Sequence, residues 1–420
     1  MKSRYQSYKQ HQFCVEGLAL ARIAKDVGTP FYVYSQSEIE GAFLSYDSAF
    51  AKVPHVICYA LKANSNLAIG RVLSRLGAGA DIVSGGELKR ALKSGFSPKQ
   101  IIFSGVAKTK DELVFAIKKG IRIINVESEE ELKCLNAVAT ELKRQAPFSL
   151  RVNPDVRAGG HPHISTGTPD NKFGVFHKQI FPLYQWAAQQ RYLQPLGIQC
   201  HIGSQITNVV PYKKALEVLL DLVSRLERVG VHLEIIDLGG GLGIDYNNDN
   251  PDSPQKLAKI LLPGLRQKGL TLFLEPGRSL VAQAGILVTK VLYRKDAGSK
   301  HFVMVDAAMN DLARPALYDS YHEIVPLFQR PGKKCQVDVV GPVCESGDYL
   351  ARNRPMVLPV QDDMLAVLSA GAYGFAMSSQ YNSRPRVAEV LVSKNGYQVI
   401  RRRETFEDLV RGESIPRELK

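Results

Sequence analysis

The chain has 420 residues, of which 45% are hydrophobic and 23% are charged, and its formal net charge is +13 at pH 7. This composition is typical of a soluble globular protein and excludes wholesale disorder. No run of 18 uncharged apolar residues exists, and Glu16 and Arg22 interrupt the first apolar stretch, which does not resemble a signal peptide. We therefore expect a cytoplasmic protein without a membrane-spanning helix.

The cysteines, histidines and positive charges argue against three further classes of protein, namely disulfide or zinc-finger proteins, metalloproteins and nucleic-acid-binding proteins. Six cysteines are scattered and form no Cys-x-x-Cys pair, so neither a disulfide framework nor a zinc finger is expected. His161 and His163 flank a proline, but no carboxylate or cysteine cluster completes a ligand set, so no metal is expected. The positive charges are dispersed except at Arg401–Arg403, and no DNA-binding helix pattern accompanies them, so no nucleic-acid partner is expected.

Between residues 30 and 282, short β-branched runs alternate with longer stretches of helical period. The expected strands are Val56–Ala60, Ala80–Ser84, Ile101–Ser104, Ile121–Val126, Ser149–Asn153, Leu196–Ile202, Leu233–Leu238 and Thr271–Glu275. The expected helices are Glu87–Lys93, Lys110–Lys119, Glu129–Lys143, Tyr212–Val229 and Pro254–Lys268, and several of them end at a glycine suited to a left-handed cap. Eight such units over roughly 250 residues predict an α/β fold, a TIM-type (β/α)8 barrel rather than an open sheet.

After residue 282 the pattern changes to strands with few long helical stretches between them. The expected strands are Gly285–Tyr293, His301–Asp306, Gln336–Val340, Met364–Ser369 and Val387–Val392. This pattern predicts a second, mainly β domain, either a β-barrel or a sandwich. We assign residues 1–29 and 283–420 to it, and residues 30–282 to the barrel.

Chemically distinctive residues lie at, or just after, the carboxyl ends of the expected barrel strands. They are Lys62, Asp81, Ser84, Arg151, Asn153, His201, Ser204, Gly239, Gly240, Gly241, Glu275 and Arg278. In a parallel barrel these ends meet at one face, where active sites form. The pattern therefore predicts that residues distant in sequence surround one small pocket.

Taken singly, each candidate has an ordinary explanation as well as a functional one. Lys62 is either an exposed loop lysine or a partly desolvated amine that can form a Schiff base with an aldehyde. His201 is either a structural histidine or a ring that stacks on a ligand ring. Glu275 is either one half of an ion pair or a carboxylate that faces a pyridinium nitrogen.

Glycines and a cysteine supply two further candidates. The segment Gly239–Gly243 reads Gly-Gly-Gly-Leu-Gly, which lacks the last glycine of the dinucleotide fingerprint and the lysine of a Walker motif. It is therefore either a tight turn or a cradle for a single phosphate group. Cys344 precedes Glu345 in a glycine-containing turn, where it is either an inert thiol or a proton donor.

Four segments together carry a family resemblance that extends over nearly the whole chain. They are Arg151–Val156 (RVNPDV), His161–Gly174 (HPHISTGTPDNKFG), Gly341–Asp348 (GPVCESGD) and Ala370–Pro385 (AGAYGFAMSSQYNSRP). With these segments the chain resembles the pyridoxal-phosphate-dependent decarboxylases of the alanine-racemase fold type, and within them the members that convert meso-2,6-diaminopimelate to L-lysine and CO2. Ala372 and Gln380 depart from the residues expected there, which are Gly and Asn.

The resemblance implies a role for each candidate residue. Lys62 would bind the aldehyde of pyridoxal 5'-phosphate, His201 would stack on its ring, and Glu275 would face its pyridine nitrogen. The further cofactor-binding residues implied are Asp81, Ser204, Gly240, Gly241, Gly277, Arg278 and Tyr373. The substrate-binding residues implied are Arg278, Arg314, Tyr318, Glu345 and Tyr373, with Cys344 as the proton donor.

The resemblance also implies a homodimer, because Cys344 and Glu345 would reach the active site of a second subunit. Two alternatives stay open. A related decarboxylase of ornithine, arginine or D-lysine has a substrate without a distal carboxylate, which would leave Arg314 without a purpose. A catalytically dead, partner-binding homologue is disfavoured because Lys62, Glu275, Cys344 and Glu345 are all present.

Overall fold

The computed structural model describes residues 3–156, 172–266, 268–298, 300–394 and 396–419, so His161 and His163 lie outside the described residues. The chain divides into two compact units. The barrel unit is Ile39–Leu280, and the β unit combines Met1–Glu38 with Val281–Lys420. The sequence predicted that the barrel begins at residue 30. Strand β4 (Phe31–Ser35) instead lies in the β unit, because it pairs with strands β14 and β20 there.

The barrel unit contains a closed ring of eight parallel strands, which confirms the predicted TIM-type barrel. The strands are β5 (His55–Ala60), β6 (Gly79–Ile82), β7 (Ile101–Phe103), β8 (Ile123–Val126), β9 (Ala146–Asn153), β11 (Leu193–Gln199), β12 (Ile235–Asp237) and β13 (Thr271–Leu274). All eight expected strands are present, and β13 pairs with β5 to close the ring. The short strand β10 (Val175–Phe176), which pairs with β9, was not predicted.

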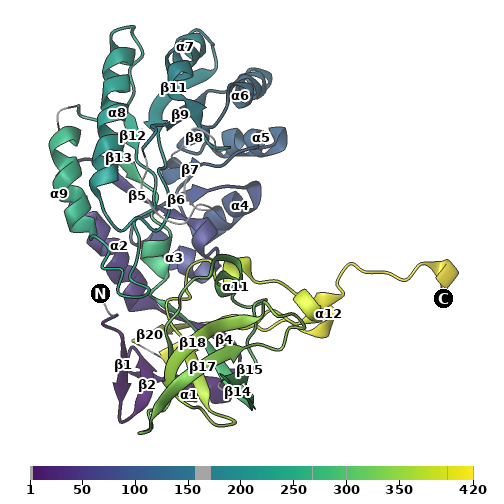
Figure 1. Cartoon of the computed structure of the whole chain (residues 1–420). Helices are drawn as coiled ribbons and strands as arrows, with labels where there is room; N and C mark the ends of the chain where they lie inside the picture. The colour runs from purple at the N-terminus through teal and green to yellow at the C-terminus, as the bar shows by residue number, and fades with distance from the viewer. Residues whose placement is uncertain (1–2, 157–171, 267, 299, 395, 420) are drawn as a thin grey trace. The chain divides into compact units, whose positions relative to one another are not determined.

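Helices connect and cover the barrel strands (Figure 1). They are α2 (Gln36–Phe50), α3 (Leu67–Arg75), α4 (Gly85–Ser94), α5 (Lys110–Lys119), α6 (Glu129–Leu142), α7 (His177–Ala188), α8 (Val210–Glu227), α9 (Pro254–Leu265) and α10 (Arg278–Val281), with the 3-10 helices η1 (Leu61–Ala63) and η2 (Pro98–Gln100). Helix α5 shows why these boundaries are readable from sequence. Thr109 and Glu112 form a capping box at its start, and Gly120 ends it in a left-handed conformation.

The inside of the barrel changes from apolar to polar along the strands. Buried Cys58, Ile102, Ile123, Leu196, Ile235 and Phe273 form an apolar cluster. Because side chains two positions apart on a strand share a face, the next inward positions lie closer to the carboxyl ends. Four of these positions hold the buried residues Ser104, Asn125, Asp237 and Glu275, here called the polar layer. The barrel thus places polar groups at the end where the candidate site residues lie.

The β unit is mainly β, as predicted. Its strands are β1 (Gln6–Lys9), β2 (Gln12–Val15), β3 (Leu18–Ala19), β4, β14 (Gly285–Ala297), β15 (Lys300–Val305), β16 (Ile324–Pro326), β17 (Lys334–Val340), β18 (Tyr349–Val357), β19 (Met364–Val367), β20 (Ala388–Ser393) and β21 (Gly396–Arg401). The large sheet has the order β18-β17-β15-β14-β4-β20-β21, and β19 pairs with both β14 and β16. Its short helices are α1 (Leu20–Val27), α11 (Arg314–Tyr318), η4 (Phe375–Met377), η5 (Tyr381–Ser383), α12 (Phe406–Leu409) and η6 (Arg417–Leu419).

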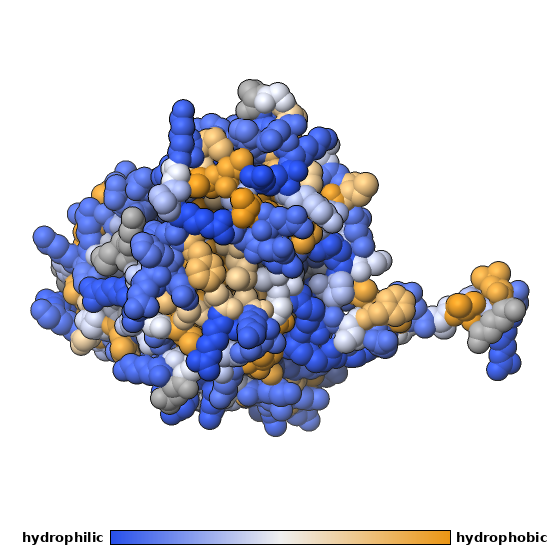
Figure 2. All heavy atoms as spheres, turned by 90° about the horizontal axis from the view of Figure 1, so that it is seen from below, coloured by the Kyte–Doolittle hydropathy of each residue, from blue (hydrophilic) through white to orange (hydrophobic). Residues whose placement is uncertain are grey.

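The C-terminal segment after β21 is here called the C-terminal arm (residues 402–419). It is tied to its own unit at Arg403 and Glu404, and the part that follows α12 extends away from the strands of this unit (Figure 1). The side chains Phe406, Ile415 and Leu419 of the arm are 67%, 67% and 76% exposed. Figure 2 shows apolar atoms along this projection. These side chains therefore add little to the core of the β unit.

Candidate active site

Lys62 and Asp81 form an ion pair at the carboxyl ends of two neighbouring strands. Lys62 lies in η1, directly after β5, and its Nζ is 2.8 Å from Asp81 Oδ2. Asp81 lies on β6 opposite Ala60 and is fully buried, whereas the Lys62 side chain is 35% exposed. The other carboxylate oxygen, Asp81 Oδ1, is buried without a hydrogen-bond partner among the described residues. The amine is therefore held at the end of the barrel that the sequence predicted.

Glu275 follows β13 and accepts hydrogen bonds at Oε1 from three side chains inside the barrel. The donors are Ser104 Oγ at 3.2 Å, Asn125 Nδ2 at 3.3 Å and Gln199 Nε2 at 3.4 Å. Burial and the neighbouring Asp237 carboxylate raise the pKa of Glu275 well above its usual range. This environment therefore favours the protonated form of Glu275, which can share its proton with a basic atom.

The His201 ring is held in its neutral form. Its Nδ1 accepts a hydrogen bond from the backbone N–H of Gly240 at 3.2 Å, which leaves Nδ1 without a proton. Burial, with the positive charges of Arg151 and Lys62, lowers the pKa of His201 well below its usual value. A neutral imidazole lies next to the glycine segment and can stack on an aromatic ring.

Close backbone packing explains the glycines that follow β12. A Cβ atom on Gly240 would lie 2.1 Å from the carbonyl oxygen of Glu275, and one on Gly241 would lie 2.1 Å from that of Gly203. Gly241 also has a φ of +109°, which side chains rarely adopt. Any larger residue would displace backbone, so this segment needs glycine for its own fold before any ligand is considered.

Ser204 and Arg278 meet beside the glycine segment. Arg278 Nη2 donates to Ser204 Oγ at 3.0 Å, and Arg278 Nη1 donates to the Tyr246 hydroxyl at 3.0 Å. Gly277 packs tightly here, since a Cβ on it would lie 3.1 Å from the Cβ atoms of both Ala60 and Ala63. A buried guanidinium, a hydroxyl and glycine backbone are the groups that bind a phosphate.

In the β unit, Arg314 begins helix α11 and Tyr318 ends it. The Arg314 guanidinium is buried, with Nη1 donating to His322 Nε2 at 2.9 Å and Nη2 donating to Ser320 Oγ at 3.3 Å. His322 in turn donates from Nδ1 to the carbonyl oxygen of Leu368 at 2.8 Å. These contacts hold the guanidinium in one orientation.

Cys344 and Glu345 are exposed on a loop that is anchored at both sides. The backbone N–H of Cys344 donates to Asn382 Oδ1 at 2.9 Å, and the Tyr381 hydroxyl donates to Glu345 Oε2 at 2.6 Å. Buried Asp348 accepts from the backbone N–H of Val343 at 2.6 Å. The loop therefore presents a thiol and a carboxylate to the surface in a defined conformation.

The thiols of Cys58 and Cys200 are buried, whereas that of Cys344 is exposed. Burial raises the pKa values of Cys58 and Cys200, so neither forms a thiolate easily. Tyr373, in the β unit, has an unusual backbone conformation. Its φ of +56° is left-handed, which is uncommon for a residue with a large side chain. Strained residues of this kind often occur at ligand sites.

The structure thus groups the predicted residues into two sets, one in each unit. The barrel set is Lys62, Asp81, His201, Ser204, Gly240, Gly241, Glu275, Gly277 and Arg278, and the β-unit set is Arg314, Tyr318, Cys344, Glu345 and Tyr373. Sequence reasoning assigned no role to Ser104, Asn125, Gln199, Asp237 and Tyr246. A signal for three of them was available, because Ser104, Asn125 and Asp237 each follow an inward apolar residue by two positions.

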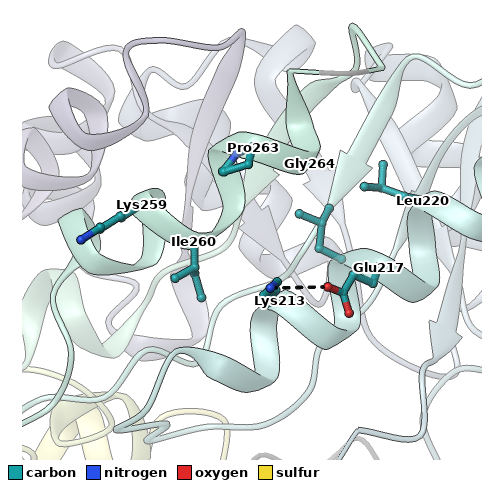
Figure 3. A pocket seen from close by; sticks show the side chains of 8 residues that line it. Lys213, Glu217, Leu220, Lys259, Ile260, Pro263 and Gly264 are labelled. Atoms are coloured by element: carbon teal, nitrogen blue, oxygen red, sulfur yellow. Dashed lines mark ion pairs between the residues drawn. The ribbon is translucent and has the colours of Figure 1, made fainter.

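A separate pocket lies between helices α8 and α9 (Figure 3). Its lining residues are Lys213, Leu216, Glu217, Leu220, Lys259, Ile260, Pro263 and Gly264. Lys213 and Glu217 form a loose ion pair of 3.9 Å there, and both side chains are exposed. None of the predicted site residues lines this pocket. The pocket is therefore separate from the candidate residues at the carboxyl ends of the barrel strands.

Comparison with known proteins shows similarity along the whole chain. Residues 36–282 match the family model for the pyridoxal binding domain of pyridoxal-dependent decarboxylases. The diaminopimelate decarboxylase of Pseudomonas aeruginosa is 49% identical over 409 residues, which are 97% of this chain and 98% of that protein. The crystal structure of diaminopimelate decarboxylase from M. jannaschii in complex with L-lysine is 38% identical, with a TM-score of 0.96 and full coverage of both chains. The Helicobacter pylori enzyme with L-lysine is 42% identical, covers 93% of this chain and 98% of its own, and has a TM-score of 0.90.

Proposed function

Because the chain belongs to the pyridoxal-dependent decarboxylase family, we propose that it converts meso-2,6-diaminopimelate to L-lysine and CO2. This carboxy-lyase reaction is the last step of lysine biosynthesis. The observation that carries the proposal is the 49% identity to the Pseudomonas aeruginosa diaminopimelate decarboxylase over 97% of the chain. L-lysine, the product, is the molecule bound in similar solved structures from two organisms.

The direct test is a substrate panel. The purified chain is incubated with pyridoxal phosphate and, in separate reactions, with meso-diaminopimelate, ornithine, arginine and D-lysine, and the amine product and CO2 are measured. We expect lysine and CO2 from meso-diaminopimelate alone. Turnover of only another amino acid would retain the family and the cofactor but contradict the proposed substrate.

The barrel residues fit pyridoxal phosphate in three respects. Lys62 offers an amine for the aldehyde, and its partner Asp81 is buried with one carboxylate oxygen, Oδ1, lacking a hydrogen bond among the described residues. Glu275, whose raised pKa favours the protonated form, suits a pyridine nitrogen, which needs a proton to become cationic. Arg278 and Ser204 beside the glycine segment suit the phosphate group.

Each barrel residue has one task in the proposed reaction. When bound, the cofactor would supply an electron sink for the electron pair that the departing CO2 leaves on the α-carbon. Lys62 Nζ would hold the aldehyde group of the cofactor through its amine. Glu275 would keep a proton at the pyridine nitrogen, and the neutral His201 ring would stack on the pyridine ring.

Arg314 is proposed to bind the distal carboxylate of diaminopimelate, together with Tyr318 and Arg278. Both ends of the substrate are amino acids, so recognition of the distal end selects the carbon that reacts. We expect Arg314→Ala to lower kcat/KM about 100-fold, mainly by raising KM, because a charged hydrogen bond to a carboxylate contributes about 1.5–3 kcal/mol. Steady-state kinetics with meso-diaminopimelate measure this change.

Two controls separate binding from folding in that experiment. Arg314→Lys retains the positive charge but loses the two-pronged guanidinium, so it is expected to have an intermediate KM. Arg330→Ala removes an exposed arginine of the same unit, which pairs with Asp363, and is expected to leave KM unchanged. Unchanged turnover by the Arg314→Ala enzyme would overturn the role proposed for Arg314.

Cys344 is proposed to return the proton to the α-carbon, and Glu345 to bind the distal amine, in the active site of a second subunit of a homodimer. The exposed loop that carries both residues supports this arrangement. So does the C-terminal arm, because exposed apolar side chains such as Phe406 suit burial between copies of the chain. The arm begins next to this loop, since Gln380 donates to Glu404 at 2.9 Å and Tyr381 contacts Glu345.

Mixing two inactive variants tests the shared site. We expect Lys62→Ala and Cys344→Ala proteins to be almost inactive alone. After dissociation and reassociation in equal amounts, the mixture should recover about a quarter of wild-type activity, because half of the dimers carry one intact site. Mixing Lys62→Ala with Lys62→Met provides the matched control and should recover nothing. Absence of recovery in the first mixture would show that both residues act in the same subunit.

A cytoplasmic location is also part of this proposal. Among the described residues, no helix is both long and apolar enough to cross a membrane. The cysteines Cys14, Cys58, Cys134, Cys200, Cys335 and Cys344 are free thiols. Free thiols suit a reducing compartment, which supports the proposed location.

A further inference from the structure

Asp237 links two parts of the barrel site that the proposed mechanism treats separately. It ends strand β12, and its Oδ1 accepts a hydrogen bond from the backbone N–H of Gly239 at 2.8 Å, at the start of the glycine segment. Its other oxygen, Oδ2, lies 3.5 Å from Asn125 Nδ2, and Asn125 Nδ2 also lies 3.3 Å from Glu275 Oε1. The Asp237 and Glu275 side chains are hydrogen-bonded to each other as well.

The two carboxyls are buried near one cation, Lys62, whose charge lowers the pKa of Glu275, and near Asp81, whose charge raises the pKa of both. Asp237 is 2% exposed and Glu275 is 4% exposed, and neither forms an ion pair with any described residue. The nearby amine of Lys62 is already paired with Asp81. Two buried carboxylates in contact repel each other strongly, so a pair of this kind retains a proton.

The donor groups around the pair decide where that proton lies. Asp237 Oδ1 accepts from Gly239, which stabilises the ionised form of Asp237. Its hydrogen bond with Glu275 therefore has Glu275 as the donor and Asp237 as the acceptor. The pKa values agree, since burial raises both and the contact with Asp237 raises that of Glu275 further.

We propose that Asp237 is a positioning residue that keeps a proton on Glu275 before the cofactor binds, so that the protein itself supplies the proton of the pyridine nitrogen. This inference rests on the proposed function, because it requires pyridoxal phosphate at Glu275. On binding, the O–H bond of Glu275 breaks and an N–H bond forms with the lone pair of the ring nitrogen. Glu275 becomes a carboxylate, which Ser104, Asn125 and Gln199 stabilise by their hydrogen bonds.

Asp237→Asn reverses the hydrogen bond between the pair while retaining the shape of the side chain. The asparagine Oδ1 can still accept from Gly239, but its Nδ2 donates to Glu275 and favours the ionised carboxylate. The ring nitrogen must then take its proton from solvent. Asp237→Ala removes both contacts and should also weaken cofactor binding, because the glycine segment loses its anchor.

Proton uptake during cofactor binding measures this difference independently of activity. Cofactor-free full-length protein is titrated with pyridoxal phosphate by calorimetry at neutral pH, in two buffers that differ in ionisation enthalpy. The difference in observed heat gives the number of protons taken up per bound cofactor. We expect the Asp237→Asn protein to take up about one proton more than the wild type at each site.

Three comparisons make the result decisive. Asp221→Asn changes an exposed carboxylate on α8 and should match the wild type. Equal uptake by wild type and Asp237→Asn would overturn the inference while leaving the proposed function intact, whereas no binding of pyridoxal phosphate to the wild type would overturn the proposed function. If Asp237→Asn fails to fold, the wild type alone decides, because the inference requires its uptake to rise with pH as Glu275 becomes ionised.

Discussion

Replacement of Lys62 by alanine is expected to reduce decarboxylation by about 1000-fold or more, since covalent attachment of the cofactor is lost. The structure places the Lys62 amine 2.8 Å from Asp81, at the carboxyl end of β5 and within the barrel set of site residues. No other group in that set is an amine. Alanine has no amine that could form the covalent link to the cofactor, so the substitution should lower kcat far more than it raises KM.

Borohydride reduction followed by peptide mass spectrometry provides the direct measurement. The wild type should carry the reduced cofactor on Lys62, and the Lys62→Ala protein should carry none on any lysine. Lys110→Ala, which removes an exposed lysine paired with Glu141, is the matched control and should retain both activity and the adduct. An adduct on a different lysine in the wild type would contradict the assignment of Lys62.

Replacement of Glu275 by glutamine is expected to lower kcat by about 100- to 1000-fold, because an amide cannot keep a proton on the pyridine nitrogen. Glutamine has nearly the same shape, and its side-chain oxygen can still accept from Ser104, Asn125 and Gln199. Cofactor binding should therefore persist while the chemical step slows. Single-turnover kinetics on the reconstituted protein measure that step.

The same substitution should change how the stability of the cofactor-free protein depends on pH. Burial raises the pKa of Glu275 in the folded chain above its value in the unfolded chain, so the folded state binds more protons. Folding stability then falls as pH rises from the unfolded pKa towards the folded one. Glu275→Gln removes this loss, so the cofactor-free variant should melt at a higher temperature than the wild type at neutral and alkaline pH.

Thermal melts of the cofactor-free wild type and variant at several pH values check this second effect. Glu217→Gln, on the exposed surface of α8, should give curves that match the wild type. A variant that is slower and also less stable than the wild type at neutral pH would show that Glu275 contributes to the fold rather than being tolerated for function.

The barrel was predictable because its strands are buried on both faces and its helices have clear ends. Most residues of the eight strands are apolar, and Thr109 and Gly120 illustrate the capping residues that bound a helix. The β unit was less predictable. Its strand β18 carries the exposed Arg352 and the half-buried Arg354, which hide the apolar pattern, and β1 to β3 are very short.

Strand β4 shows a second limit of prediction from sequence, which concerns the partners of a strand. Its five residues, Phe31–Ser35, are all buried, and a buried apolar run of this length is clear evidence of a strand. Its partners are β14 and β20, which lie more than 200 residues further along the chain. Local patterning cannot identify such partners, because pairing depends on where the chain returns in space.

The sequence by itself determined the fold class and the barrel candidates Lys62, His201, Glu275 and Arg278, because each lies where a predicted strand ends. Only the tertiary structure decided how these groups are held. The contact between Asp237 and Glu275 and the donors Asn125 and Gln199 depend on the register of strands around the closed ring. Hydrogen bonds act over about 3 Å, so their partners are set by side chains that the barrel brings together from separate strands.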